Sequence, residues 1–140
     1  MKANMKTILY LSLAALLALS GCKKEPSLSE LVLGEWRGTG LSADAGVYLY
    51  FAPDGTFELY QKLDGETFEL RRGTWSVEGN MISGIYNDRQ PWATTYKVSV
   101  KGKELTLAEQ NEGGETNIYY KTEIPGYIKE SATVVVKSAY

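Results

Sequence analysis

Short runs rich in Val, Ile, Tyr, Phe, Trp and Thr, broken at regular intervals by glycine-containing turns, dominate the chain from residue 34 to about residue 123. Within these runs apolar and polar residues alternate, which is the period of a strand with one buried face. No stretch keeps a helical period of 3.6 residues for more than two turns. The pattern therefore predicts an all-β domain.

The first clear hairpin turn is the segment 52–56, whose sequence is Ala-Pro-Asp-Gly-Thr. It suits a type I turn that ends with Gly55 in the left-handed region, which gives a three-residue hairpin loop. Directly opposite residues share one face of a sheet. The predicted register pairs Phe51 with Phe57 and Leu49 with Leu59 on the inner face, and Tyr48 with Tyr60 on the outer face.

The second hairpin turn is Asp64-Gly65, a sequence that suits a two-residue type I′ turn. Its predicted register keeps the inner face of the first hairpin, and Gly73 then predicts a bulge that restores the parity of the fourth strand. Trp75 and Val77 are expected to face inward after that bulge. The predicted pairs are Gln61 with Phe68, Leu59 with Leu70 and, on the outer face, Glu58 with Arg71.

Four further strands are expected at about residues 81–86, 94–101, 103–109 and 116–122, and residues 34–41 form the first strand. Eight sequential antiparallel strands with short connections most simply close into an up-and-down barrel, because closure removes the exposed edges of an open sheet. The expected inward residues of the last four strands are Ile82, Gly84, Tyr86, Tyr96, Val98, Val100, Leu105, Leu107, Ile118 and Tyr120.

The N-terminus has the parts of a secretion signal, with two lysines, an apolar run from Ile8 to Leu19, and small residues before Cys22. The run is too short to cross a hydrocarbon core of about 30 Å. The sequence Leu-Ser-Gly-Cys at 19–22 resembles the lipobox of bacterial lipoproteins, which implies cleavage after residue 21 and acylation of Cys22. We therefore expect a signal peptide at 1–21, a lipidated tether at 22–30, a barrel at 31–123 and an extension at 124–140.

Composition excludes several classes of function. The chain has no histidine and a single cysteine, so zinc or copper sites of imidazole or thiolate and Ser-His or Cys-His nucleophile pairs are excluded. Without residues 1–21 it carries 13 basic and 17 acidic side chains, a net charge of −4, which argues against nucleic acid as a partner. No catalytic site, metal site or cofactor is predicted.

Several motifs resemble the lipocalin-like domains of Gram-negative envelope lipoproteins. Gly34-Glu35-Trp36 is similar to the Gly-x-Trp motif that follows a short helical turn in lipocalins, and segments 51–57, 73–82 and 105–107 match the rest of the pattern. Lys121 stands where many lipocalins place an arginine that packs on the tryptophan. The resemblance implies an eight-stranded barrel with a short N-terminal helical turn, closed at the end where Trp36 lies.

If Trp36 marks the closed end, residues 41–46, 64–65, 87–93 and 111–115 surround the open mouth. Loop 87–93 is the best functional candidate, because arginine and tryptophan side chains stack on and orient small ligands. The inward residues below it would give a pocket of aromatic surfaces with a few polar groups. The alternative is an interior filled by its own side chains. The candidate ligand-binding residues are Gln61, Phe68, Tyr86, Arg89, Trp92 and Tyr96.

A second candidate surface lies on the outside of the barrel. Tyr48, Tyr50 and Tyr60 are expected to project outward on paired strands, and exposed tyrosine clusters are typical of recognition surfaces. Cross-strand tyrosines also stabilise a sheet that has no partner. The β-branched run at 133–136 could add one more strand after the barrel.

Two functions follow from these features. The favoured one is a lipid-anchored envelope protein, at the outer membrane through Cys22, that binds a small hydrophobic or amphiphilic ligand at the barrel mouth. The alternative is a protein-recognition barrel, such as an envelope inhibitor or assembly accessory, that acts through its outer tyrosines and loops. A cavity would favour the first function, and a filled interior beside a flat aromatic patch would favour the second.

Overall fold

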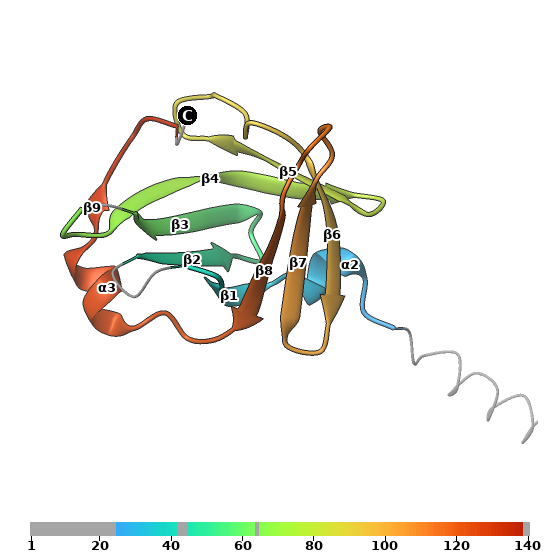
Figure 1. The fold of residues 1–140 in the computed structure, drawn as a ribbon, viewed down its shortest axis with the longest axis horizontal. Helices are drawn as coiled ribbons and strands as arrows, with labels where there is room; N and C mark the ends of the chain where they lie inside the picture. Colours follow the sequence, from blue (N-terminus) through green and yellow to red (C-terminus); the bar gives the residue numbers. More distant parts are fainter. Residues whose placement is uncertain (1–24, 42–44, 64, 139–140) are drawn as a thin grey trace, which may run out of the picture.

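The computed structural model describes residues 25–41, 45–63 and 65–138. Eight antiparallel strands follow one another in it, each pairing with the next along the chain, and the first and the eighth pair to close the barrel (Figure 1). The predicted fold class is therefore confirmed. The strands are β1 (Gly34–Gly38), β2 (Gly46–Phe51), β3 (Thr56–Lys62), β4 (Glu69–Glu78), β5 (Met81–Tyr86), β6 (Tyr96–Lys101), β7 (Glu104–Glu109) and β8 (Thr116–Lys121).

The predicted signal peptide and Cys22 lie outside the described residues. Among the helices of the described part, none is long and apolar enough to cross a membrane.

The register of the first hairpin agrees with the prediction. The amide of Ala52 donates to the carbonyl of Thr56 at 2.9 Å, and Gly55 has a φ of +86°. In the turn, Asp54 Oδ1 accepts hydrogen bonds from the amide and the hydroxyl of Thr56 at 3.0 and 2.6 Å. The observed pairs are Phe51 with Phe57, Leu49 with Leu59 and Tyr48 with Tyr60.

The predicted register of the second hairpin is wrong by one residue. Gln61 pairs with Glu69, Leu59 with Arg71 and Tyr60 with Leu70, so the side chains of β4 before Gly73 lie on the face opposite to the prediction. The turn residue Asp64 lies outside the described residues. Instead of Arg71, it is Arg72 that forms an ion pair with Glu58, at 2.9 Å.

This register makes a bulge at Gly73 unnecessary, and β4 is continuous from Glu69 to Glu78. Trp75 and Val77 pack against the core as predicted, because the odd-numbered residues of β4 already face inward. Gly73 is required for another reason. A Cβ atom there would lie 2.0 Å from the carbonyl oxygen of Ile85 and 2.8 Å from the ring of Phe57.

The predicted faces of β8 are reversed. Tyr119 packs against the core, whereas Ile118 and Tyr120 are exposed. The cause is the closing pair of the barrel, in which Lys121 lies opposite Trp36 with its Nζ 4.7 Å from the centre of the ring. Tyr119 is two residues from Lys121 and so shares its inward face.

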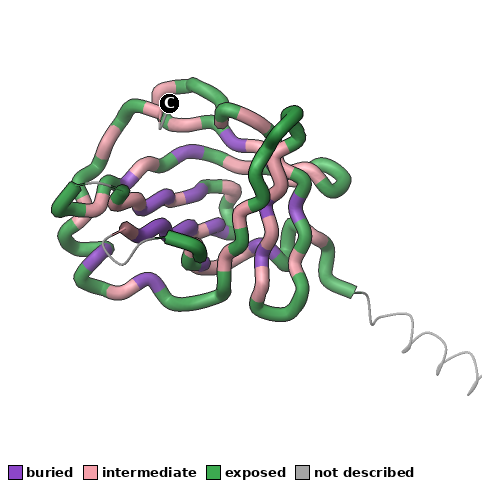
Figure 2. Tube along the Cα trace, in the orientation of Figure 1, coloured by how far each residue is buried: buried purple, intermediate pink, exposed green. Residues whose placement is uncertain are grey.

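The closed end of the barrel lies beneath the short helix α2 (Leu28–Leu31). Trp36 and Val32 have no exposed surface, and Trp36 Nε1 donates to the carbonyl of Val32 at 2.8 Å. Lys121 Nζ donates to the carbonyl of Leu33 at 2.7 Å. Buried residues in Figure 2 are concentrated on the paired strands, and the exposed loops 110–115 and 87–91 mark the opposite, open end.

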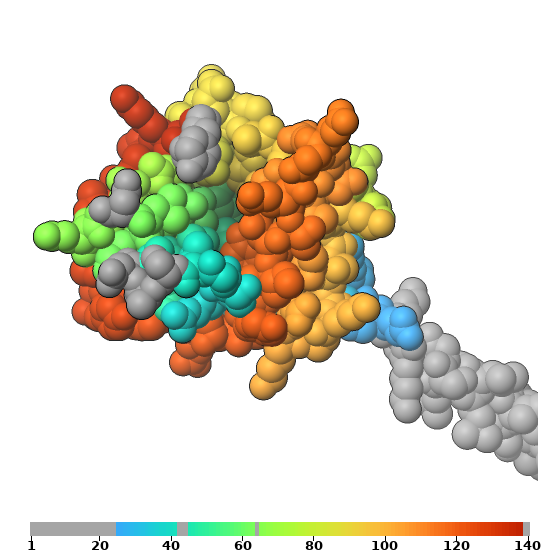
Figure 3. Space-filling view, viewed as in Figure 1, coloured from blue at the N-terminus to red at the C-terminus, as the bar shows by residue number. Residues whose placement is uncertain are grey.

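The C-terminal segment forms a second core on the outside of the barrel. Helix α3 (Gly126–Ser131) and strand β9 (Thr133–Val134) follow β8, and β9 pairs in parallel with β4. In Figure 3 this segment, in red, lies along the green strands. The buried residues of this second core are Tyr48, Tyr60 and Leu70 from the barrel, and Ile124 and Ile128 from the C-terminal segment.

The outer tyrosines are therefore not an exposed recognition surface. Tyr60 is 2% exposed, Tyr48 is buried, and Tyr50 is partly buried against the same cluster. Burial is the main cause that raises the pKa of Tyr60 to about 12, and Glu58 adds to it. Glu35 of β1 holds the C-terminal segment against the barrel. Its carboxylate accepts a hydrogen bond from the amide of Ile124 at 3.0 Å and forms an ion pair with Lys129 at 2.8 Å.

Candidate ligand-binding pocket

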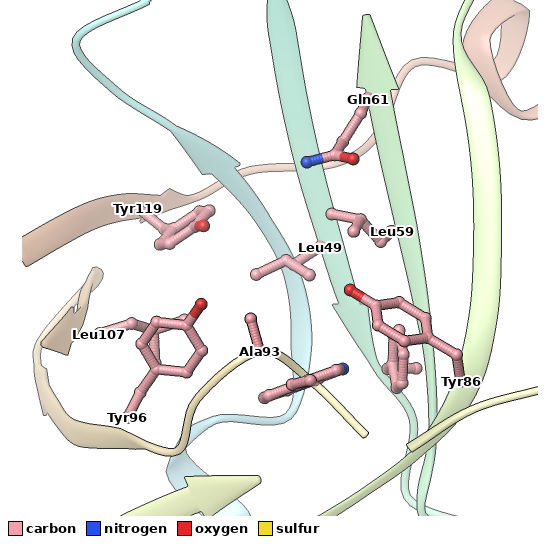
Figure 4. Close-up of a pocket in the computed structure, with 10 residues that line it drawn as sticks. Leu49, Leu59, Gln61, Tyr86, Ala93, Tyr96, Leu107 and Tyr119 are labelled. Carbon is pink, nitrogen blue, oxygen red and sulfur yellow. The ribbon is translucent and has the colours of Figure 1, made fainter. Parts of the chain in front are cut away.

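A pocket of about 140 Å³ lies inside the barrel, among inward side chains of six strands and of the loop between β5 and β6 (Figure 4). Both aliphatic and aromatic side chains line the pocket. Its lining consists of Leu49, Phe57, Leu59, Gln61, Tyr86, Trp92, Ala93, Tyr96, Leu107 and Tyr119.

The loop between β5 and β6 enters the barrel wall. The two strands pair at only two positions, Met81 with Lys97 and Ile82 with Tyr96. Beyond them Pro91 forms a bridge with Ile85, and the amide of Trp92 donates to the carbonyl of Gly84 at 2.9 Å. The loop thus replaces β6 as the partner of the end of β5.

Gly84 makes room for the indole of Trp92. A Cβ atom on Gly84 would lie 2.2 Å from Trp92 Cε2, so a larger residue would displace the indole. The ring then meets Phe57 at a centroid distance of 5.3 Å and Tyr96 at 6.0 Å, both edge to face. Trp92 is therefore part of the pocket wall and is not at the loop tip.

Four polar side chains join this apolar lining. In Figure 4 the amide of Gln61 and the hydroxyls of Tyr86, Tyr96 and Tyr119 point toward the pocket. Burial raises the pKa of Tyr119 far above its ordinary value of 10, and burial also raises that of Tyr96. Both hydroxyls are therefore protonated at neutral pH and are able to donate or accept a hydrogen bond.

A second cavity lies next to this pocket, toward the open end. It measures about 210 Å³ and shares Gln61, Tyr96 and Tyr119 with the first. Its remaining lining comes from the ends of β1, β2 and β8 and from the segment that follows β1, and includes Thr39, Leu41 and Asn117. The three shared residues thus stand between an inner apolar space and an outer, more polar one.

The structure brings together four of the six predicted ligand-binding residues: Gln61, Tyr86, Trp92 and Tyr96. Phe68 is not among the lining residues, because the register shift places it on the outer face, 6.0 Å from the ring of Tyr48. Arg89 is exposed in the loop, with a φ of +69°, and is also absent from the lining. Sequence reasoning missed Tyr119 and Ala93.

Arg71 is an unexpected charged residue on the inward face near the mouth. It lies opposite Leu59, and its side chain is only 13% exposed. Its guanidinium pairs with Glu69 at 3.0 Å and donates from Nε to the carbonyl of Lys137 at 3.3 Å. The C-terminal segment also reaches loop 87–93, where the amide of Ser138 donates to Asp88 Oδ2 at 2.7 Å.

The described residues contain no group of three or more acidic, histidine or cysteine side chains that could hold a metal ion. The arrangement defines a small β-barrel with an internal, mostly apolar pocket. A family model for a lipocalin-like domain matches residues 32–107, and the chain belongs to that family. No curated protein matches the chain. The fold is typical of binding proteins rather than of enzymes.

Replacing Trp92 by alanine tests the position of the loop. We expect a loss of about 1–3 kcal/mol in the free energy of unfolding, because the indole packs on Phe57 and Tyr96 but is partly exposed. Denaturant melts measure the change, and Arg89→Ala in the same loop is the control that should leave stability within about 0.5 kcal/mol.

Proposed function

We propose that the mature protein is a lipid-anchored envelope protein that binds a small hydrophobic or amphiphilic molecule inside its barrel. The observation that carries this proposal is the internal pocket, where four polar groups converge on a mostly apolar lining. Binding sites for small molecules have this composition, with a few placed polar groups that fix the orientation of the ligand.

The anchor is proposed from the sequence of residues 1–22, and the fold is compatible with it. The chain enters the barrel through α2 at the closed end, next to Val32 and Trp36. The cavity next to the pocket is at the other end, between Thr39, Asn117 and Tyr96. A tether at Cys22 would therefore leave the mouth accessible from the aqueous side.

The alternative function, recognition of another protein through the outer tyrosines, has less support. Tyr48 and Tyr60 are buried beneath α3, so they offer no contact surface while that helix is in place. The pocket, in contrast, is a feature that a barrel filled by its own side chains would lack. We therefore favour ligand binding.

Native mass spectrometry of the protein purified from its own host tests the proposal. We expect a co-purifying molecule that is lost on denaturation. Ala93→Trp should fill the pocket from its rim and abolish that added mass, whereas Thr95→Trp, at an exposed position of the same loop that is not part of the lining, should retain it. Equal retention by both variants would place the molecule elsewhere, and no bound molecule in any sample would contradict the proposal.

The anchor has its own test. Cys22→Ser removes the only thiol of the chain. We expect this variant to leave the membrane fraction and to accumulate unprocessed or soluble, because each buried acyl methylene contributes about 0.8 kcal/mol to membrane binding. Fractionation and intact-mass measurement give the result. Firm membrane association after signal cleavage would contradict lipidation at Cys22.

A further inference from the structure

The inner pocket restricts the size of what it holds. Its volume of about 140 Å³ is close to that of apolar cavities that accept a single benzene ring, about 150 Å³. A long acyl chain would extend through the second cavity and out of the mouth. One ring, or a group of similar size, fits the inner pocket alone.

The aromatic wall of the pocket favours a ring. Phe57 meets Tyr86 at a centroid distance of 5.7 Å and Trp92 at 5.3 Å, in both cases edge to face. Trp92 meets Tyr96 in the same way. Aromatic side chains held by one another present fixed faces and edges, against which a further ring packs in offset or edge-to-face geometry.

The pocket contains no charged group to balance a charged ligand. Its ten lining residues include no lysine, arginine, aspartate or glutamate, and the partly buried Tyr96 and Tyr119 are protonated at neutral pH. Arg71, the cation on the inward face near the mouth, already pairs with Glu69. Glu109 lies opposite Tyr96 and contributes to its raised pKa, but it is not part of the lining. A carboxylate or an ammonium group held within the lining would lose its hydration without direct contact with a counter-ion, which is costly.

The same pocket does satisfy a neutral polar group. The amide of Gln61 and the hydroxyl of Tyr119 lie on the boundary between the two cavities, and both act as donor and acceptor. A hydroxyl, carbonyl or amide on the ring would reach them from the inner pocket.

On the basis of the proposed ligand-binding function, we infer that the inner pocket selects an uncharged, ring-sized group that carries one hydrogen-bonding substituent near Gln61 and Tyr119. This disfavours ligands that would place a carboxylate or an ammonium group inside the inner pocket. The selection arises from the uncharged lining of the inner pocket and from the polar residues that this pocket shares with the second cavity.

Three probes that each carry a one-carbon substituent on a phenyl ring test the charge: benzyl alcohol, benzoate and benzylammonium. Calorimetric titration of the purified mature protein, with detergent alone as the blank, should show binding of benzyl alcohol. The two ions should bind at least about tenfold more weakly, because the pocket offers them no counter-ion. 1-Hexanol, an open chain with the same hydroxyl, should also bind more weakly than benzyl alcohol.

Tyr119→Phe tests the hydrogen bond, with Tyr120→Phe, on the outer face of the same strand, as the matched control. Loss of the Tyr119 hydroxyl should weaken the affinity for benzyl alcohol by about three- to tenfold, the usual effect of one hydrogen bond. Toluene, which lacks the hydroxyl, should bind both variants equally. An equal effect of both variants on benzyl alcohol would contradict the role of Tyr119.

The outcomes separate this inference from the proposed function. Equal or tighter binding of benzoate, benzylammonium or 1-hexanol would overturn the inference and leave ligand binding intact. If no probe binds but a co-purifying molecule is found in native mass spectra, the inference is likewise overturned and the proposed ligand binding still stands. No binding and no co-purifying molecule would overturn both.

Discussion

Replacement of Phe57 by alanine is expected to lower the free energy of unfolding by about 3–5 kcal/mol, the range for removal of a buried aromatic side chain. Phe57 is 1% exposed and packs edge to face on Tyr86 and Trp92. Its ring also covers Gly73, where no side chain fits. The surrounding strands pair on both sides of Phe57, so the site has little freedom to collapse. Equilibrium unfolding in denaturant gives the value.

The informative comparison is with Tyr60, on the opposite face of the same strand. The sequence placed Tyr60 on the outer face, where an exposed side chain would contribute little to stability. In the structure α3 covers Tyr60, so we now expect a loss of at least about 2 kcal/mol. Tyr120→Ala, at a position that is 50% exposed, should cost less than about 1 kcal/mol. A Tyr60 value as small as that of Tyr120 would mean that the second core does not form.

The elements that the sequence predicted correctly are those determined by local chemistry. The turn at 52–56 determines the first register through Gly55 and the Asp54 cap, and alternation then defines the inner face. The closed end followed from the resemblance around Trp36. Each of these features depends on residues within one hairpin or one short motif.

The register of the second hairpin depended on residues far along the chain. Phe68 and Leu70 are apolar and seemed to belong in the barrel, but the outer face also has an apolar cluster, contributed by Ile124 and Ile128. The pattern of hydrophobic residues in β4 does not show which of its faces packs on the barrel core and which packs on the second core. The one-residue shift then placed Arg71 inside, where Glu69 and the C-terminal segment satisfy it.

The candidate site was predicted in part for the same reason. Gln61, Tyr86 and Tyr96 followed from strand alternation, and all three line the pocket. Tyr119 was missed because Ile118 and Tyr120 were assigned to the inner face, whereas Tyr119 lies opposite the inward Leu105 and Lys121 lies opposite Trp36. That signal was present in the sequence, since a cation stacked on Trp36 requires residue 119 to face inward.

The second core, on the outside of the barrel, gives another prediction with a large effect. Ile128→Ala should lower the free energy of unfolding by about 2–5 kcal/mol, because Ile128 is 1% exposed and packs among Tyr48, Tyr60 and Leu70. Tyr127→Ala, the neighbouring position on α3, is the matched control. Tyr127 is 69% exposed, so its removal should change stability by less than about 0.5 kcal/mol.

Titration of Tyr60 shows whether the packing of α3 is what buries this side chain. Burial raises its pKa to about 12, so the neutral form is favoured in the folded protein and the resulting stability is lost as the pH rises from 10 through 12. If Ile128→Ala releases α3 while the barrel stays folded, the pKa of Tyr60 should fall toward its ordinary value of 10. Ultraviolet titration with and without Tyr60→Phe isolates this one residue. An unchanged pKa together with an unchanged stability would contradict the packing of α3 on the barrel.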